Sequence, residues 1–248
     1  MLPEDEQERI CEARRKTGWG PRLLAGRLGH PHATISKTLK RNGCSRRERA
    51  PRQPANRYEW PCPGDMLHMD SSSYARFDRP GHAVTGDRSK TGAQKRAAIG
   101  YDYAHAVVDD HSRLAYAELL PDEQAATVVA FTERALAFFA THGIRAKRLM
   151  TDNAWCYTHS RGFHELLSRH GIKHLTTQPY RPRTNGKVER FHQTMAREWA
   201  HGVHYHNSTA RHRALPHWLN HYNTARPHSS LRGQPPNSRV QNLRRQDI

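Results

Sequence analysis

Three acidic residues far apart in the sequence, Asp70, Asp152 and Glu189, have the side chains and the settings to do chemistry. Asp70 and Asp152 each end a short apolar run predicted to be a buried strand, Met66–Met69 and Leu149–Thr151. Glu189 follows a turn-rich segment and opens a predicted helix. Carboxylates that meet at the ends of such elements are suited to a divalent cation, because hard cations prefer oxygen ligands. The pattern therefore predicts a metal site.

The charge of the chain indicates what such a site would act on. Its 248 residues include 40 Lys and Arg against 23 Asp and Glu, a formal net charge of +17. A chain this cationic favours a polyanionic partner, because cations on phosphates release condensed counterions. Ribosomal-type packing or simple solubility would also explain the charge, but the helical and strand periodicity along the chain disfavours both. A metal site in such a chain indicates chemistry on nucleic acid.

Cysteine usage and hydropathy bound the cellular setting. No CxxC pair occurs among the four cysteines, so free thiols in a reducing compartment are expected of Cys11, Cys44, Cys62 and Cys156. A zinc site of Cys156 with His159 and His164 is a weaker alternative, because no second cysteine pair completes it. The acidic N-terminus is unlike a signal peptide, and no apolar run reaches membrane-spanning length. We expect a soluble, cytoplasmic protein without a membrane partner.

Alternating strand and helix patterns from about residue 64 must position the three acids. The order β-β-β-α-β-α-β-α predicts an α/β fold with helices covering a mixed sheet. The predicted strands are 66–70, 99–109, 113–119, a run ending at 152, and 172–176. A polar loop is predicted over 78–97. Asp122 is predicted to cap a helix that Gly143 ends, and Gly171 to end the next helix.

The helix that carries Glu189 has the clearest periodicity. Its apolar residues recur at i, i+3, i+7 and i+11 and predict one buried stripe: Val188, Phe191, Met195 and Trp199. Glu189 lies about a hundred degrees from Val188 around the axis, so it flanks the stripe and can lean over the sheet. Lys187 and Arg190 lie off the stripe and are expected to face DNA. A further helix is predicted around 215–222, and the tail from 233 is expected to be ordered only by docking.

Three helices are predicted ahead of this α/β part, at 5–16, 22–28 and 34–42. Ala25, Gly29 and Ile35 fall at the small, turn and apolar positions that the corner of a helix-turn-helix needs. Polar side chains suited to phosphates and base edges share the outer face of the last helix: His32, Ser36, Lys37, Lys40 and Arg41. An ordinary helical bundle is the alternative, and the flanking charge favours DNA binding. The Arg- and Pro-rich linker that follows, with Arg46 and Arg47, is predicted to run extended along a DNA backbone.

Five blocks of sequence, taken in order and with their spacing, carry a family resemblance. They are Leu67–Asp70, Val107–Arg113, Thr151–Asn153, Pro179–His192 and Tyr222–His228. Together they resemble bacterial insertion-sequence transposases of the DDE group, which have a retroviral-integrase-like catalytic core. The resemblance implies an RNase H-like mixed sheet flanked by helices and preceded by a small helix-turn-helix domain. The implied boundaries are 1–43 for that domain, 44–63 for the linker, 64–203 for the core, and 204–248 for a C-terminal helix and tail.

The resemblance also implies roles. Asp70, Asp152 and Glu189 would be the catalytic residues and the ligands of two Mg²⁺ ions, for which Mn²⁺ would substitute, with Asp70 binding both. Asn153 would orient Asp152 or a metal-bound water, and Lys187 and Arg190 would hold phosphates. Two further residues are expected to support the site, Asn185 and Gly186. The expected partners are element ends, target DNA and further copies of the chain, with no small-molecule cofactor.

Each acid also has a purely structural explanation. Alone, Asp70 could end a strand, Asp152 could start a turn and Glu189 could favour a helix N-terminus; the three together disfavour this. The pair Asp109 and Asp110 is excluded from the site, because it is expected to close a strand turn and pair with Arg113.

Two departures from the family pattern leave alternatives open. The segment between Asp152 and Glu189 has 189 − 152 − 1 = 36 residues, one more than the integrase pattern usually has. Relatives commonly carry a further helix-turn-helix ahead of the one predicted here, so a truncated or alternatively started copy is expected. The chain would then be a DDE transposase active in DNA cleavage and strand transfer, or a truncated, non-catalytic repressor. An RNase H-type nuclease that cuts without joining is disfavoured by the predicted helix-turn-helix and the arginine linker.

Overall fold

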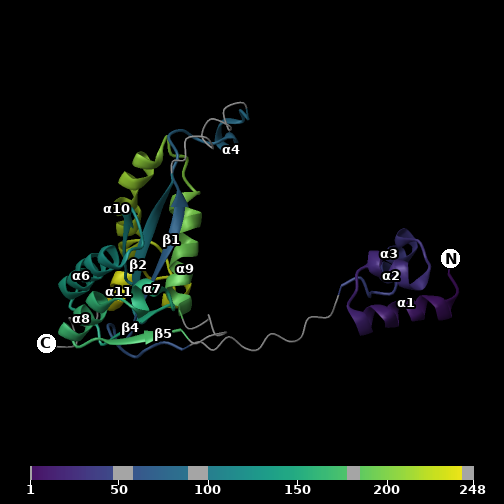
Figure 1. Cartoon of the computed structure of the whole chain (residues 1–248), viewed down its shortest axis with the longest axis horizontal. Coiled ribbons are helices and arrows are strands. Elements are labelled where there is room, and N and C mark those ends of the chain that lie inside the picture. The colour runs from purple at the N-terminus through teal and green to yellow at the C-terminus, as the bar shows by residue number, and fades with distance from the viewer. Residues whose placement is uncertain (1, 47–57, 89–99, 178–184, 242–248) are drawn as a thin grey trace. The chain divides into compact units, whose positions relative to one another are not determined.

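The structure is a computed structural model that describes residues 2–46, 58–88, 100–177 and 185–241 (Figure 1). The chain divides into two compact units, Met1–Arg57 and Tyr58–Ile248. No helix in the described part of the chain is long and apolar enough to cross a membrane.

The first unit contains the three predicted helices. They are α1 (Glu4–Thr17), α2 (Pro21–Leu28) and α3 (His32–Arg41). A small core holds them together, formed by Ile10, Leu24, Ile35 and Leu39. Gly29 ends α2 with φ +72°, a left-handed conformation that favours glycine, which gives the short turn into α3. Three helices around such a corner are compatible with a helix-turn-helix, and that assignment stays a prediction.

The second unit is built on a five-stranded mixed sheet in the order β3-β2-β1-β4-β5. The strands are β1 (Leu67–Ala75), β2 (Tyr101–Asp109), β3 (Ala115–Leu120), β4 (Arg148–Thr151) and β5 (Lys173–Thr176). The first three pair antiparallel, and β4 and β5 run parallel to β1. This confirms the predicted α/β fold with a mixed sheet.

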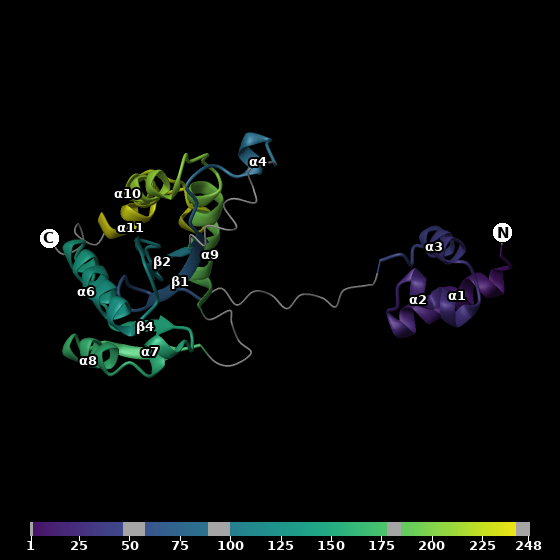
Figure 2. The ribbon, with the colours of Figure 1, turned by 45° about the horizontal axis from the view of Figure 1, so that its top comes forward.

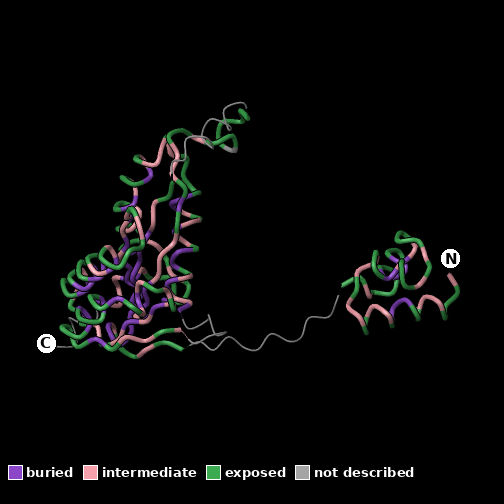
Figure 3. Tube along the Cα trace, in the orientation of Figure 1, coloured by how far each residue is buried: buried purple, intermediate pink, exposed green. Residues whose placement is uncertain are grey.

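Helices cover both faces of this sheet (Figures 1 and 2). One face packs against α6 (Ala125–Thr141), α7 (Trp155–Thr158) and α8 (Arg161–Arg169). The other packs against α9 (Gly186–Met195), its π-helical continuation η2 (Ala196–Ala200) and α10 (Ser208–Thr224). Buried residues follow the strands and the inner faces of these helices (Figure 3). Successive residues of a strand point to opposite faces of the sheet. Met69 of β1 is therefore buried in the core on the α6 side, and Tyr74 in the core on the α9 side.

The predicted stripe on the helix of Glu189 is confirmed, since Val188, Phe191, Met195 and Trp199 are all buried on the α9 side of the sheet. The tail is also partly ordered: η3 (Ser229–Leu231) and α11 (Pro236–Gln241) follow α10. Val240 of α11 is buried in the core on the α6 side, in keeping with the expectation that docking orders the tail.

Some predicted boundaries were wrong. The first strand continues five residues beyond Asp70, because Ser71–Ser73 pair with β2 although they lack apolar alternation. The predicted loop 78–97 contains the short helix α4 (His82–Thr85), and its part from 89 onward lies outside the described residues. Asp122 does not cap α6, which begins after Gln124; its carboxylate accepts a hydrogen bond from the Gln124 amide and closes the preceding turn.

Candidate active site

Asp70 lies in the middle of β1, the central strand of the sheet. It pairs with Ala106 of β2 and is partly buried. By strand alternation its side chain belongs to the same face as His68, which contacts Asn185 at the start of α9. Asp70 therefore points to the α9 side of the sheet.

The electrostatic surroundings of Asp70 are unusual. Burial raises its pKa, which reaches about 6, because desolvation penalises the charged form. A hydrogen bond from the backbone of Ser71 lowers the pKa, whereas the negative charges of Asp152 and Glu189 raise it. A third carboxylate, Glu123, raises it as well. Three other acids from distant parts of the sequence thus act on the pKa of Asp70.

Asp152 follows β4, the strand that pairs parallel with β1 beside Asp70. Its carboxylate Oδ1 accepts a hydrogen bond from the Ala154 amide at 2.9 Å. The hydroxyl of Thr151 donates to the main-chain carbonyl of Asp152 at 2.8 Å. These bonds fix the turn from β4 into α7, and with it the position of the carboxylate.

Glu189 lies in the first turn of α9 and is partly buried. The buried side chains of Val188 and Phe191 hold this turn against the sheet. Asn185 fixes the start of the helix, since its amide Nδ2 donates to the Met69 carbonyl at 3.1 Å. The helix start is therefore attached to β1 directly beside Asp70.

The donor chemistry of the three acids fits a hard divalent cation. Carboxylate oxygens suit Mg²⁺ and Mn²⁺. A cation would offset both burial, the main cause of the raised pKa of Asp70, and the repulsion from the other acids that adds to it. As the side chains stand, no three His, Cys, Asp or Glu residues of the described ranges are arranged as a complete set of metal ligands. The fit of the three acids to a divalent cation therefore rests on their carboxylate oxygens and on the effect of their charges on Asp70.

Sequence reasoning missed two residues beside Asp70. Glu123 accepts a hydrogen bond from the hydroxyl of Ser71, next to Asp70 on β1. The sequence signal that could have identified Glu123 is its position just after the strand β3. His192 lies one turn beyond Glu189, buried against the main chain of Asp70, and burial lowers its pKa to about 4. Its spacing of four residues from Val188 placed it on the buried stripe.

Asp110 is the centre of a buried polar network that reaches the start of α9. Its Oδ1 accepts from Nε2 of His68 at 2.9 Å and from Nζ of Lys187 at 2.9 Å. The other ring nitrogen of His68 is 3.1 Å from Oδ1 of Asn185. Burial alone would raise the pKa of Asp110, but the hydrogen bonds from His68 and Lys187 hold it well below its usual range.

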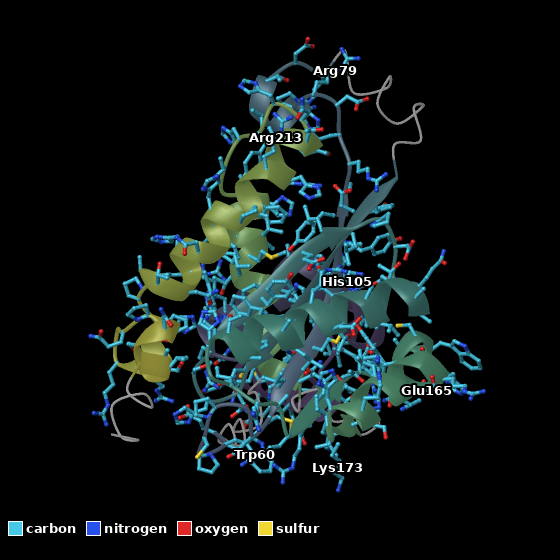
Figure 4. All side chains as sticks on the ribbon, turned by 90° about the vertical axis from the view of Figure 1, so that its left-hand side faces the viewer. Trp60, Arg79, His105, Glu165, Lys173 and Arg213 are labelled. Carbon is cyan, nitrogen blue, oxygen red and sulfur yellow. The ribbon has the colours of Figure 1, made fainter. Side chains whose placement is uncertain are left out.

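The segment that enters the second unit joins the same network. Trp60 donates its amide to Oδ2 of Asp110 at 2.8 Å, and the carbonyl of Tyr58 accepts from Lys187 at 2.9 Å. Glu59 pairs with Arg113 at 3.0 Å and with Arg239 of α11. Figure 4 shows Trp60 at the same end of this unit as Lys173 of β5.

Asp109 and Asp110, the pair that we excluded from the site, make structural contacts. Asp109 accepts from the Gly64 amide and from the amide and hydroxyl of Ser112, so it closes the turn after β2. Arg113 lies 4.0 Å from Asp110, but its closer partner is Glu59. The expected pairing is therefore only a minor contact.

Several supporting residues have contacts other than those expected. Asn153 donates to the Thr177 carbonyl at 2.9 Å and ties the end of β4 to the end of β5. Its role in orienting Asp152 or a metal-bound water stays a prediction. Lys187 is engaged by Asp110 and is not directed to solvent. Arg190 is exposed and donates a hydrogen bond to Gln193.

The remaining expectations concern α9 and the first unit. Gly186 is the first residue of α9, and nothing in the described chain would crowd a side chain there. The five residues expected to contact DNA from α3 are all exposed: His32, Ser36, Lys37, Lys40 and Arg41. Arg46 is exposed as well, whereas Arg47 and the turn-rich segment before Asn185 lie outside the described residues.

Comparisons with known sequences identify the family that the chain resembles. Two family models, both described as integrase core domain, match residues 61–182 and 170–236. A 39.2 kDa insertion element IS476 protein of Xanthomonas euvesicatoria is 35% identical over 101 residues, 40% of this chain and 29% of that protein. A putative integrase, ORF3, of Spiroplasma virus SpV1-C74 is 26% identical over 146 residues, 54% of this chain and 40% of that protein. The chain thus spans well under half the length of these relatives.

Solved structures give the same fold. The catalytic core domain of BIV integrase superposes with a TM-score of 0.51 at 19% identity, covering 74% of this chain and 98% of that one. A chain of the simian T-cell lymphotropic virus intasome, solved with PP2A regulatory subunit B56 gamma, gives 0.55 at 16% identity, covering 93% of this chain and 74% of that one. At these identities the likeness establishes the RNase H-like fold of the core.

Proposed function

The chain is a protein of the DDE transposase and integrase type, and from this premise we propose that it cleaves and joins DNA strands to move an insertion sequence. The observation that carries the proposal is that Asp70, whose pKa is raised mainly by burial, is also influenced by the negative charges of Asp152 and Glu189 from distant parts of the sequence. Carboxylates brought together in this way repel each other, and a bound divalent cation offsets the repulsion.

In this proposal Asp70, Asp152 and Glu189 hold two Mg²⁺ or Mn²⁺ ions. When bound, such ions activate the attacking oxygen and stabilise the leaving 3′-oxygen of a phosphodiester. Asp70 would help to hold both ions, since it lies on the central strand and the charges of the other two acids act on it. Asn185 positions Glu189 by tying the start of α9 to β1. The chain needs no covalent protein–DNA intermediate, so no Ser or Tyr nucleophile is assigned.

Binding of DNA is assigned to two surfaces. The exposed face of α3 would lie in a major groove, where Lys37, Lys40 and Arg41 would contact phosphates and base edges. Arg190, exposed in the same turn of α9 as Glu189, would hold a phosphate near the reacting bond. Element ends and target DNA are the proposed partners, and the chain would act as a homo-oligomer on them.

A joining assay tests the proposal. Purified protein with Mg²⁺ or Mn²⁺ and a pre-cleaved DNA end should join that end to target DNA. Asp152→Asn should abolish joining and spare DNA binding, because it removes one ligand charge and keeps the shape. Glu165→Gln, an exposed acid on α8, is the matched control and should join normally.

The outcomes separate the alternatives. If wild type and Asp152→Asn bind DNA equally and neither joins it, a non-catalytic repressor is the better description. If the wild type cuts DNA but never joins it, a nuclease is the better description. Joining by Asp152→Asn at the wild-type rate contradicts the assignment of the site.

A further inference from the structure

An exposed aromatic pair lies directly beside Asp152. Trp155 is 75% exposed, more than any other large apolar side chain of the described residues that is classed as exposed. Its indole ring is parallel to the imidazole ring of His159, with 3.6 Å between the ring centroids and 4° between the planes. The imidazole covers one face of the indole and leaves the other facing solvent. A tryptophan in this state is poorly explained by packing, because it buries little of its surface.

The pair is held rigidly relative to Asp152. Trp155 begins α7, and the Ala154 amide before it is bound by the carboxylate of Asp152. The hydroxyl of Thr158 donates to the Ala154 carbonyl at 3.1 Å and lies 2.8 Å from Nδ1 of His159. Since the hydroxyl proton is used on the carbonyl, Nδ1 of His159 is the donor in the second bond. The imidazole is therefore oriented by its own helix.

The charge around the pair is mixed. No Asp or Glu occurs from 153 to 164, where Arg161 and two histidines do, but Asp152 and Glu165 bound this stretch. Arg161 is highly exposed on the first turn of α8, where it pairs with Glu165. The whole chain carries +17. A flat apolar surface on so cationic a chain suits a ligand that is aromatic on one side and anionic on the other.

We propose that Trp155 and His159 form a stacking platform for an unpaired nucleobase of the DNA that lies at Asp152. Bases inside a duplex present only their edges, so an open indole face can be used by a base that is unpaired or terminal. Stacking on tryptophan depends little on base identity, because every base has a π face. The proposal rests on the proposed function only in taking DNA as the ligand, and it does not require that the chain be catalytically active.

A binding measurement tests the platform without any reaction. The full-length chain is titrated, without divalent cation, with a blunt duplex and with the same duplex bearing one unpaired terminal base. Stacking of one base predicts about five- to a hundredfold tighter binding of the second duplex. Trp155→Ala should remove this preference, Trp155→Phe should keep part of it, and His159→Ala should weaken it. Tyr101→Ala, which removes another exposed aromatic from the same unit, is the matched control and should keep it.

A fluorescent base gives a second readout that needs no variant. With 2-aminopurine at the unpaired position, binding by the wild type should quench its fluorescence, and Trp155→Ala should remove the quenching. Circular dichroism checks that the variants are folded.

The proposal is overturned if Trp155→Ala keeps the wild-type preference, as it would if Trp155 served a protein partner. It is also overturned if the wild type shows no preference, or if the variant loses affinity for both duplexes equally. Failure of strand joining with a preserved preference would contradict the proposed function alone. Joining without the preference would contradict the platform alone.

Discussion

At the scale of single residues, Asp70 combines burial, the main cause of its raised pKa, with the negative charges of Asp152, Glu189 and Glu123. A carboxylate whose pKa is raised holds its proton more tightly in the folded state than in the unfolded chain. Its ionisation therefore opposes folding. The free energy of unfolding falls as pH rises from the usual pKa of an aspartate to the raised pKa of Asp70, about 6. In our proposal a bound cation would offset this cost.

Asp70→Asn should consequently stabilise the metal-free protein. In EDTA at pH 8 the variant should exceed the wild type by about 1–2 kcal/mol in the free energy of unfolding, allowing for partial solvent screening. The difference should vanish below about pH 4, where both states of the wild type are protonated. Chemical denaturation across pH measures this.

The control substitution, at Asp65, should change the free energy of unfolding in the opposite direction. Asp65 has a pKa lowered by its hydrogen bond with Lys147, so Asp65→Asn should lower stability at pH 8. Added Mg²⁺ should stabilise the wild type and reverse the order of wild type and Asp70→Asn. A loss of stability in Asp70→Asn in EDTA at pH 8 would refute the interpretation.

At the scale of elements, the Asp110 network connects the entry of the second unit to the helix of Glu189. It contacts Trp60, His68 and Lys187, and through His68 it reaches Asn185. Each partner belongs to a different segment. A change at Asp110 should therefore be felt both in stability and in the position of α9.

Asp110→Asn should destabilise the protein by about 3 kcal/mol, because it leaves Lys187 without its counter-charge and disturbs the buried hydrogen bond with His68. Since the pKa of Asp110 is lowered, its contribution is present at neutral pH and is lost in acid, below the usual pKa of an aspartate. Glu118→Gln, which removes a more exposed pair with Arg134, should change stability by less than about 1 kcal/mol. Equal effects of the two substitutions would contradict the network.

Most elements were predictable because their apolar periodicity is clean. The stripe on α9 is an example, since packing against the sheet alone decides it. The continuation of β1 through Ser71–Ser73 was not, because pairing with β2 decides a polar strand and pairing is invisible in a local pattern. The contacts of Lys187, Asn153 and Glu123 were missed for the same reason: their partners lie far away in the sequence, on other elements.

At the scale of the whole molecule, the two units divide recognition from chemistry in our account. The first unit is too small to hold a large core, and its outer helix α3 presents only polar side chains at the positions assigned to DNA. The second unit carries the acids. In this account the net charge of +17 favours DNA binding by both units, because each cation that contacts a phosphate adds to the affinity.

Replacing Lys37, Lys40 and Arg41 with Ala should weaken DNA binding by the full-length chain. If each side chain neutralises one phosphate, the salt dependence of the binding constant should become shallower by about 0.9 per contact. Fluorescence anisotropy over a range of salt concentrations measures this. The charge-matched control replaces three exposed cations of α1 with Ala: Arg9, Arg15 and Lys16. If both triple variants lose the same affinity and slope, α3 has no special role in binding.

Direct counting of bound manganese tests the central claim, that positions 70, 152 and 189 share divalent ions. Electron paramagnetic resonance of free Mn²⁺ is followed during titration of the DNA-bound protein. We predict two ions for the wild type and for Glu165→Gln, and loss of tight binding when Asp70, Asp152 and Glu189 are replaced together by their amides. Unchanged Mn²⁺ binding by that triple variant would contradict the account.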